Sequence, residues 1–335
     1  MPERDHPNGF TDPLRLVRLA VQSGQFKEAW SRLTRLDTPI QASPEGRLLG
    51  AMASWRLGEY ARSRSAALEA RDAFRAKGDT DGEMRAENVA AAGAFAIGNL
   101  HVAELGFRRA LELADALGDD LMIARCANNL GNIAYYRADT QNALSFYRLA
   151  MANFERLGFS TGIAEAWLNS AIVLQDAGEL DASREAGERA IEAAELSGDE
   201  RILGQALAAR GETDAALGEL HVARALAERA RSLAASHDHV VGEADALRIL
   251  STIARLSGHP DDGEQLAREA LHIVSEVNDP WRRAEVQRDL AELYGTVGRP
   301  QDAARAYEDA AEAFESLGAT TRASEMRERL STLSA

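Results

Sequence analysis

Apolar residues recur at intervals of three and four along the chain, the spacing that places them on one face of an α-helix. The clearest example is residues 162–198, which predict two consecutive helices separated by a turn at Gly178. The first helix has an apolar face formed by Ile163, Ala166, Trp167, Ala171 and Leu174. The second has an inward face formed by Ala182, Ala186, Ala190, Ile191 and Ala194. No window shows the alternation of a strand, so the pattern predicts an all-α protein.

The helical pattern repeats every forty residues, which is the mark of a repeat architecture. One set of equivalent positions consists of Gly58, Gly98, Gly178, Gly218, Gly258 and Gly298, with Ala138 at the position that lacks glycine. A second set consists of Gly78, Gly118, Gly158, Gly198 and Gly318, with Asp238 and Asn278 at the positions that lack it. A third set is alanine throughout, at Ala70, Ala110, Ala150, Ala190, Ala230, Ala270 and Ala310.

Each set of positions has a physical reason. A glycine just past a helix adopts the left-handed backbone conformation that ends the helix without a Cβ clash. Asp and Asn are the next residues to tolerate that conformation. Two such ends per repeat imply two helices per repeat. The alanines indicate places where two helices approach too closely for a larger side chain. One helix pair cannot bury its apolar face alone, so neighbouring pairs must stack.

The repeats predict a solenoid of eight helix pairs over residues 11–318. Seven pairs end at residues 78, 118, 158, 198, 238, 278 and 318, and an earlier one spans about 12–40 with its turn at Gly24. That first pair is out of phase with the others, and we interpret residues 37–44 as an irregular joint. Residues 319–335 predict a capping helix, because the last apolar face must be covered. Its apolar side chains are Ala323, Met326, Leu330 and Leu333. Residues 1–10 are expected to form a flexible tail.

Three prolines mark expected helix starts, because each follows a residue that can cap a helix. They occur in Asp12-Pro13, Ser43-Pro44 and Asp279-Pro280. An Asp or Ser side chain accepts a hydrogen bond from the first turn, and proline fits the first helical position.

The repeat resembles the tetratricopeptide repeat. The strongest match is residues 127–154, with Leu130-Gly131, Ala143, Tyr147 and Ala150 at that family's characteristic positions. Residues 290–314 match again, with Leu290, Ala303, Tyr307 and Ala310. The forty-residue spacing resembles the long-helix subtype found in kinesin light chain, in the LGN/Pins spindle adaptors and in many bacterial signalling proteins. Gly187 and Ala227 depart from the pattern, since the family has a large residue there.

The resemblance implies a right-handed superhelical solenoid of helix-turn-helix repeats. In this family the first helix of each pair lines a concave groove, which usually binds an extended peptide or a partner helix without catalysis. The resemblance therefore implies a non-enzymatic scaffold that binds a peptide or helical segment of a partner protein. The alternative is a regulatory sensor module, a peptide- or ligand-responsive repeat protein that controls a separate effector.

Polar and aromatic side chains recur at groove-facing positions of the first helices. Asn can both donate to and accept from a peptide backbone, Arg can bind a carboxylate through two hydrogen bonds, and aromatic rings supply rigid contact area. Asn is disfavoured inside helices, so something other than helix propensity maintains it there. The predicted partner-binding residues are Trp55, Arg85, Asn88, Phe95, Arg125, Asn128, Asn132, Tyr135 and Gln175.

A structural interpretation of the same residues stays open: the aromatic side chains would be core residues, and Arg85 and Arg125 would be solvated. A second pair of equivalent positions holds Arg248 and Arg288. Asp245 and Glu285 precede them by three residues on the same predicted helices. This spacing favours solvated ion pairs within each helix over a binding role.

Composition supports a helical protein and narrows its partners. The 335-residue chain is rich in alanine and has only 8 prolines and 6% aromatic residues, which is typical of helices. Its 38 Lys and Arg against 53 Asp and Glu give a net charge of −15. Such a chain repels phosphate backbones, so no nucleic-acid partner is expected, whereas a basic protein segment would be attracted.

Three features favour a cytoplasmic setting without a membrane partner. No stretch approaches 18 apolar residues. The opening segment MPERDHPNGF lacks the apolar core of a secretory signal. Cys126 is the single cysteine, so no intramolecular disulfide can form. The oligomeric state is left open.

Catalytic and metal motifs are weak. Residues 158–162 match G-x-S-x-G, but a helix is predicted before them where a serine hydrolase has a strand. His237-Asp238-His239 occupies a predicted turn with no further ligand nearby in sequence, which favours a surface turn over a metal site. Cys126 has no activating His nearby in sequence and is expected to be a buried, inert thiol. We therefore expect no catalytic site, no metal, no cofactor and no enzymatic activity.

Overall fold

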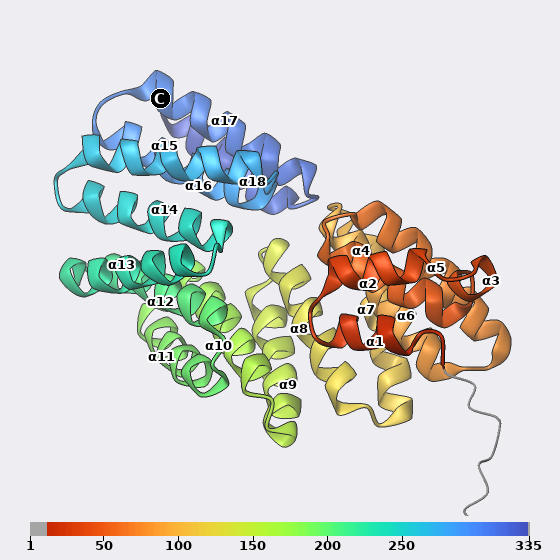
Figure 1. Cartoon of the computed structure of the whole chain (residues 1–335). Helices are drawn as coiled ribbons and strands as arrows, with labels where there is room; N and C mark the ends of the chain where they lie inside the picture. The colour runs from red at the N-terminus through yellow and green to blue at the C-terminus, as the bar shows by residue number, and fades with distance from the viewer. Residues whose placement is uncertain (1–11, 334–335) are drawn as a thin grey trace, which may run out of the picture. The chain divides into compact units, whose positions relative to one another are not determined.

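The computed structural model describes residues 12–333, which form 18 helices and no strand within that range (Figure 1). The predicted tail at residues 1–10 lies outside the described residues. The chain divides into two compact units, Met1–Asp119 and Asp120–Ala335. The all-α prediction is confirmed. The boundaries proposed for the repeat region and the capping segment stay predictions.

The first unit contains α1 (Arg15–Gln22), α2 (Phe26–Thr34), α3 (Thr38–Gln41), α4 (Pro44–Arg56), α5 (Tyr60–Lys77), α6 (Thr80–Ala96) and α7 (Leu100–Leu117). The second contains α8 (Asp120–Tyr136), α9 (Thr140–Leu157), α10 (Ser160–Asp176), α11 (Leu180–Ser197), α12 (Glu200–Ala216), α13 (Leu220–Ser236), α14 (Val240–Leu256), α15 (Pro260–Glu276), α16 (Pro280–Thr296), α17 (Pro300–Ser316) and α18 (Thr320–Leu333).

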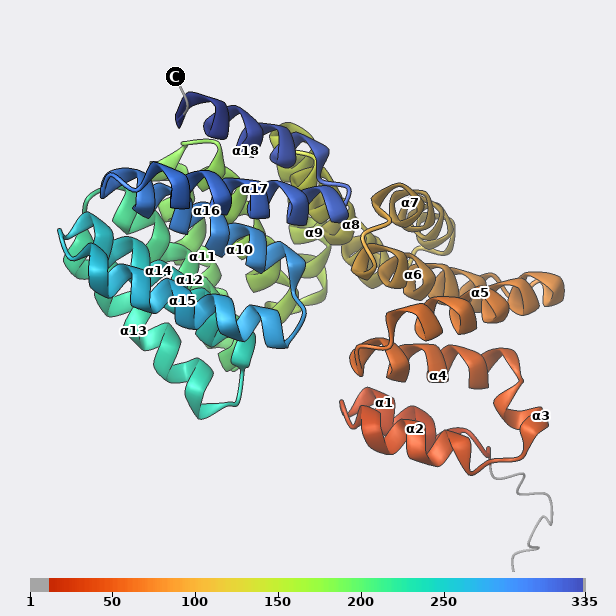
Figure 2. The same cartoon turned by 90° about the horizontal axis from the view of Figure 1, so that it is seen from above.

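Helices of the second unit form two layers. Each even-numbered helix from α8 to α16 packs against the odd-numbered helix that follows it, as the sequence repeat requires. The same helices also pack against one another in series, α8 on α10, α10 on α12, α12 on α14 and α14 on α16 (Figure 2). This second set of contacts brings the first helices of the pairs into a continuous layer, which we call the inner face.

Helix ends follow the repeat as predicted. All the glycines of both sets have positive φ, and so do the three residues that replace them, Ala138 (58°), Asp238 (51°) and Asn278 (52°). The left-handed residue lets the next backbone N–H turn back onto the helix, as from Asp139 to the carbonyl of Ala134 at 2.9 Å. After Gly198 the N–H of Asp199 instead donates to the Ser197 hydroxyl at 3.1 Å. Ala138 therefore carries a conformation that glycine adopts at lower cost.

The positions of closest helix packing are also as predicted, with one correction. Every alanine of the third set is at most 2% exposed. In α11, however, Ala182 is exposed, and Ser183 faces inward in its place. The buried Ser183 hydroxyl donates to the carbonyl of Ala171 on α10 at 2.9 Å. A small polar side chain is stable at this crossing because the neighbouring helix supplies its acceptor.

Two of the three proposed helix starts are confirmed. Ser43 accepts from the backbone N–H of Gly46 at 3.1 Å, and Asp279 accepts from that of Arg282 at 3.0 Å. The third is wrong in position, because α1 begins at Arg15, and Asp12 accepts from the backbone of Leu14 in the preceding turn.

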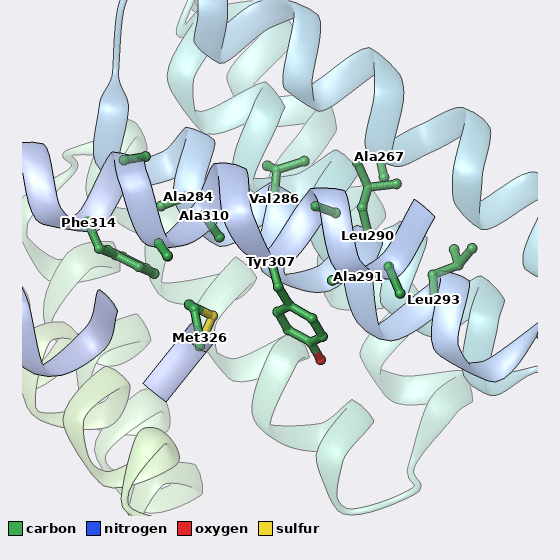
Figure 3. Packing of buried hydrophobic residues seen from close by; sticks show 14 of the residues in the cluster. Ala267, Ala284, Val286, Leu290, Ala291, Leu293, Tyr307, Ala310, Phe314 and Met326 are labelled. Atoms are coloured by element: carbon green, nitrogen blue, oxygen red, sulfur yellow. The ribbon is translucent and has the colours of Figure 1, made fainter. Parts of the chain in front are cut away.

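The C-terminal helix α18 packs against the last helix pair. Met326 is buried in the cluster formed with α16 and α17 (Figure 3). Ala323 is buried in the same cluster, and Leu330 and Leu333 pack at its edge. These are the four apolar positions that the sequence predicts for a covering helix.

Candidate functional site

Four of the predicted binding residues lie in the first unit, on α4 and α6. Trp55 is half-buried and packs edge-to-face against Tyr60, with ring centroids 6.3 Å apart. The guanidinium of Arg56 lies 5.0 Å from the centre of the same indole. Asn88 and Phe95 are half-buried on α6. The Trp55 ring therefore has its partners close by in sequence.

Arg85, also on α6, is half-buried between two carboxylates. Its guanidinium lies 3.7 Å from Glu45 and 3.6 Å from Asp81. Pairs of this length and exposure contribute little to stability, about 0–1 kcal/mol. The side chain is therefore held only loosely within its own unit.

The other five predicted residues lie in the second unit, on α8 and α10. Arg125 is exposed. Asn128 accepts a hydrogen bond of 3.1 Å from the side-chain amide of Asn169 on α10. This pair of amides joins two consecutive helices of the inner face. Sequence reasoning did not include Asn169, although an Asn in mid-helix, one position from the place equivalent to Asn128, is a visible signal.

Asn132 and Gln175 contribute to packing between helices. The Tyr147 hydroxyl on α9 donates to the side-chain oxygen of Asn132 at 2.8 Å. The hydroxyl of Thr213 on α12 lies 3.0 Å from the side-chain oxygen of Gln175, which can accept its hydrogen bond. Tyr147 is buried, and Asn132 supplies the acceptor for its hydroxyl. The buried Thr213 hydroxyl also has the carbonyl of Ala209 within reach at 3.1 Å.

Arg248 corrects the sequence interpretation. It is 7% exposed rather than solvated, and it does not pair with Asp245. Its guanidinium on α14 donates to both oxygens of Glu212 on α12, at 2.7 and 2.6 Å, and to Asp289 on α16 at 2.8 Å. Arg288 also binds Asp289, at 2.9 Å, rather than Glu285. The inner face thus contains a buried ionic network that joins three successive helices.

Two carboxyl groups near these arginines, Asp289 and Glu285, have pKa values shifted in opposite directions. Although burial alone would raise the pKa of Asp289, Arg288 and Arg248 hold that pKa below its ordinary value. For Glu285 the balance is reversed, because burial raises its pKa to about 7 against the opposing effect of Arg248 and Arg288. The negative charge of Glu212 raises the pKa of Glu285 further. One carboxyl of the inner face therefore titrates near neutral pH.

Side chains from the two ends of the second unit meet. The rings of Tyr136 on α8 and Trp281 on α16 are stacked, with centroids 3.8 Å apart and planes 10° apart. Tyr135 packs against the same indole at 5.5 Å. Arg322 on α18 donates to Asp176 on α10 at 2.6 Å. We call these five residues the clasp, because they join α8 and α10 to α16 and α18.

Tyr135 connects the clasp to the predicted binding residues. Its ring lies 5.0 Å from the Arg322 guanidinium. Burial, followed by the negative charges of Asp176 and Glu285, raises the pKa of the Tyr135 hydroxyl well above its ordinary value. The hydroxyl therefore stays protonated and can donate a hydrogen bond at any physiological pH.

The weak catalytic motifs lie where the sequence predicts. Residues 158–162 join the end of α9 to the start of α10, with Gly158 in the left-handed conformation, so no strand precedes the serine. Cys126 is fully buried on α8. His237 pairs with Glu200 at 2.6 Å, and burial lowers the pKa of His239. Between residues 12 and 333, no cluster of three or more His, Cys, Asp or Glu side chains could hold a metal ion.

No helix within the described part of the chain is both long enough and apolar enough to cross a membrane.

Comparison with known proteins places the fold among helical-repeat proteins. A family model described as SNAP, soluble NSF attachment protein, matches residues 225–335, about a third of the chain. No curated protein matches the sequence.

Several solved structures share the fold. A Rap protein complexed with Competence and Sporulation Factor is 14% identical, with a TM-score of 0.66 and 96% of each chain covered. NprR in complex with its cognate peptide NprX is 13% identical, with a TM-score of 0.65, covering 98% of this chain and 99% of NprR. Aspartyl phosphate phosphatase F from Bacillus subtilis is 11% identical, with a TM-score of 0.56, covering 99% and 96%. The chain is therefore similar in architecture, from end to end, to tetratricopeptide-type repeat proteins.

Proposed function

We propose that this protein is a binding scaffold that holds an extended peptide, or a helical segment of a partner protein, on the inner face of its repeats. The observation that carries the proposal is the hydrogen-bonded amide pair of Asn128 and Asn169 on consecutive inner helices, with Arg125 exposed one turn away. Amides on an inner face can donate to and accept from a peptide backbone, whatever its sequence.

The similar structures support the same proposal. Two of them hold a peptide or peptide factor, Competence and Sporulation Factor on a Rap protein and NprX on NprR. The likeness in fold does not by itself determine function, because one fold serves many functions. The predicted partner-binding residues of both units belong to this proposal, with Asn169 added.

The test measures peptide binding to the full chain. An array of unrelated ten-residue peptides identifies binders, and calorimetry then gives the dissociation constant of the tightest. The double variant Arg125→Glu/Asn128→Ala should weaken binding at least tenfold, because it removes a backbone partner and reverses a charge. The control is Arg148→Glu, which makes the same charge change on an exposed position of α9, outside the inner face.

Binding that is unchanged in the double variant, or weakened equally by Arg148→Glu, would place the binding surface elsewhere. Failure of every peptide in the array would contradict the proposal as a whole.

A regulatory sensor is the second candidate, and the clasp favours it. Contacts between Tyr136 and Trp281 join helices that are distant in sequence, so a bound peptide could shift the population of closed and open forms of the second unit. A peptide-dependent change in the fluorescence of Trp281, recorded against a Trp281→Phe variant, would support the sensor. Binding without any such change supports the scaffold.

We propose further that the chain belongs to the long-helix subtype of the repeat and acts by binding rather than by catalysis. Paired helices of 17 and 18 residues support the first point. The burial of Cys126 and the helical surroundings of Ser160 support the second. One similar structure is a phosphatase by name, so an assay with aryl and aspartyl phosphates tests this part directly. A single, buried thiol also suits the reducing cytoplasm, where we place this function.

A further inference from the structure

A cavity of about 350 Å³ lies beside the clasp in the second unit. One wall is formed by Tyr135 of α8 and Asp176 of α10, and the opposite wall by side chains of α16, α17 and α18. Its volume is at the lower end of the range for small-ligand sites, about 300–1,000 Å³. The cavity exists only because the two ends of this unit meet, so its shape depends on the clasp being closed.

Charges around the cavity are unusual for this chain. Three guanidinium groups line it, Arg288, Arg322 and Arg329, but only two carboxylates, Asp176 and Glu325. The whole chain has a net charge of −15, yet this lining has an excess of positive charge. Because carboxylates outside the lining pair with Arg288 and Arg329, an anion would be bound by the remaining guanidinium N–H donors rather than by a net positive charge.

The three arginines are already held in position. Arg288 donates to Asp289 at 3.0 Å, and Arg329 donates to Glu292 at 2.7 Å. Neither of these carboxylates lines the cavity. A guanidinium has five N–H donors, so a group anchored on one side can still bind a ligand with the other. Such anchoring reduces the entropy lost when a ligand binds.

One donor in the cavity wall is unsatisfied. The Nε of Arg322 is buried and has no hydrogen-bond partner within the described residues. An unmade hydrogen bond at a buried donor is unfavourable. The remaining lining includes the apolar side chains of Val173, Phe314 and Met326, which suit a small apolar group.

We propose that this cavity is a binding site for a carboxylate carried on a small apolar group, and that its occupation locks the clasp. The carboxylate would be bound by Arg288, Arg322 and Arg329, and the apolar group by Phe314 and Met326. Both a peptide terminus and a free carboxylic acid have this chemistry. The amide pair of Asn128 and Asn169 does not line this cavity, whereas Tyr135, one of the predicted partner-binding residues, does.

A bound ligand would lock the clasp because the two walls of the cavity belong to opposite ends of the second unit. A ligand that touches both α10 and α18 binds the closed form and gains nothing in the open form. Binding therefore shifts the population toward the closed form by the difference in affinity. Trp281 reports on this site, because its ring lies 5.5 Å from Tyr135 and 5.1 Å from Phe314, both of which line the cavity.

The experiment uses N-acetyl-L-leucine as the probe on the ¹⁵N-labelled full chain. The Trp281 indole N–H signal, assigned with Trp281→Phe, should shift with N-acetyl-L-leucine and not with N-acetyl-L-leucinamide. The acid should also raise the thermal unfolding temperature more than the amide does. Inorganic phosphate, which has charge but no apolar group, should bind at least tenfold more weakly than the acid.

Arg329→Gln tests the charge without endangering the fold, since this side chain is about half exposed. It should weaken binding of the acid at least tenfold. The matched control is Arg327→Gln on the same helix, which pairs with Glu315 and does not line the cavity. The control should bind the acid as the unmodified chain does.

Equal binding of acid and amide, equal effects of the two arginine variants, or no Trp281 shift at millimolar acid would each overturn the site. A peptide ending in a free leucine carboxylate then distinguishes the sources. If it binds at least tenfold more tightly than N-acetyl-L-leucine, the ligand is a peptide terminus; equal affinity points to a free acid. In Arg125→Glu/Asn128→Ala, peptide binding should be lost while binding of N-acetyl-L-leucine persists. That result distinguishes this site from the site of the proposed function.

Discussion

The two units contain the same repeat, but the charged side chains on the first helices of their pairs find partners differently. In the first, Arg85 lies between Glu45 and Asp81 at 3.6–3.7 Å and stays half-buried. In the second, Arg248 is 7% exposed and forms three short hydrogen bonds to helices on either side. Arg322 reaches Asp176 across 146 positions of sequence.

The difference shows which positions the repeat controls. The repeated glycine and alanine positions have the same conformation and burial in both units, because they depend only on contacts within one helix pair. Charged and aromatic positions do not, because their partners depend on how several pairs stack. In the second unit, charged and aromatic residues at those positions form the buried ionic network, the clasp and the lining of the cavity. It is therefore the part of the molecule in which we expect ligand binding to be concentrated.

Removing Arg248 should have the largest effect. Arg248→Ala leaves Glu212 and Asp289 without their shared partner, and breaking a buried ion pair in this way costs about 3–5 kcal/mol. Arg85→Ala should cost about 0–1 kcal/mol, as exposed pairs do. Urea unfolding followed by circular dichroism measures both. Similar losses in the two variants would show that the units do not differ in this respect.

Enlarging a packing alanine should have the same effect in either unit. Ala70→Leu and Ala150→Leu each add bulk at a fully buried helix crossing, and we expect both to destabilise the fold by about 2–3 kcal/mol. The same unfolding measurement applies. A cost found in one unit but not the other would mean that their helix pairs are packed at different densities.

Stability should depend on pH through Glu285. Its pKa is about 7 in the folded chain against an ordinary value of 4.5, so the folded state binds the extra proton between these values. The free energy of unfolding therefore falls by about 1–2 kcal/mol, the size expected for a half-buried group, as pH rises from about 4.5 to 7. Above pH 7 it is level. Glu285→Gln should remove that fall and be the more stable form at pH 8.

Unfolding curves recorded at pH 5, 6, 7 and 8 for both forms provide the check. Parallel curves for the original chain and Glu285→Gln would show that this carboxyl is ionised throughout the range.

The smallest effect concerns a helix end. Ala138 has φ of 58°, so Ala138→Gly should stabilise the second unit by about 1 kcal/mol. The reverse change in the first unit, Gly98→Ala at φ of 79°, should destabilise it by a similar amount. Thermal unfolding detects both shifts. Stabilisation by neither or by both changes would contradict the shared geometry of these turns.

Local features of the fold were predictable from the sequence. The helix ends at Asp238 and Asn278 and the burial of Ala150 follow from spacing alone. The inward position of Ser183 was missed, because a serine at a crossing is stable only when the neighbouring helix presents a carbonyl. Asn128 stays a predicted binding residue, and its hydrogen bond with Asn169 on the neighbouring helix is visible only in the structure.

The sequence alone determined that this chain forms stacked helix pairs, where the repeated left-handed residues end the helices, and which repeated alanines are buried. These depend on contacts within one repeat or between adjacent repeats, which a forty-residue period records. Only the tertiary structure decided that Arg248 pairs across three helices, that Tyr136 stacks on Trp281, and that a cavity lies beside the clasp. Such contacts arise from small rotations accumulated over several pairs, and no single repeat encodes that sum.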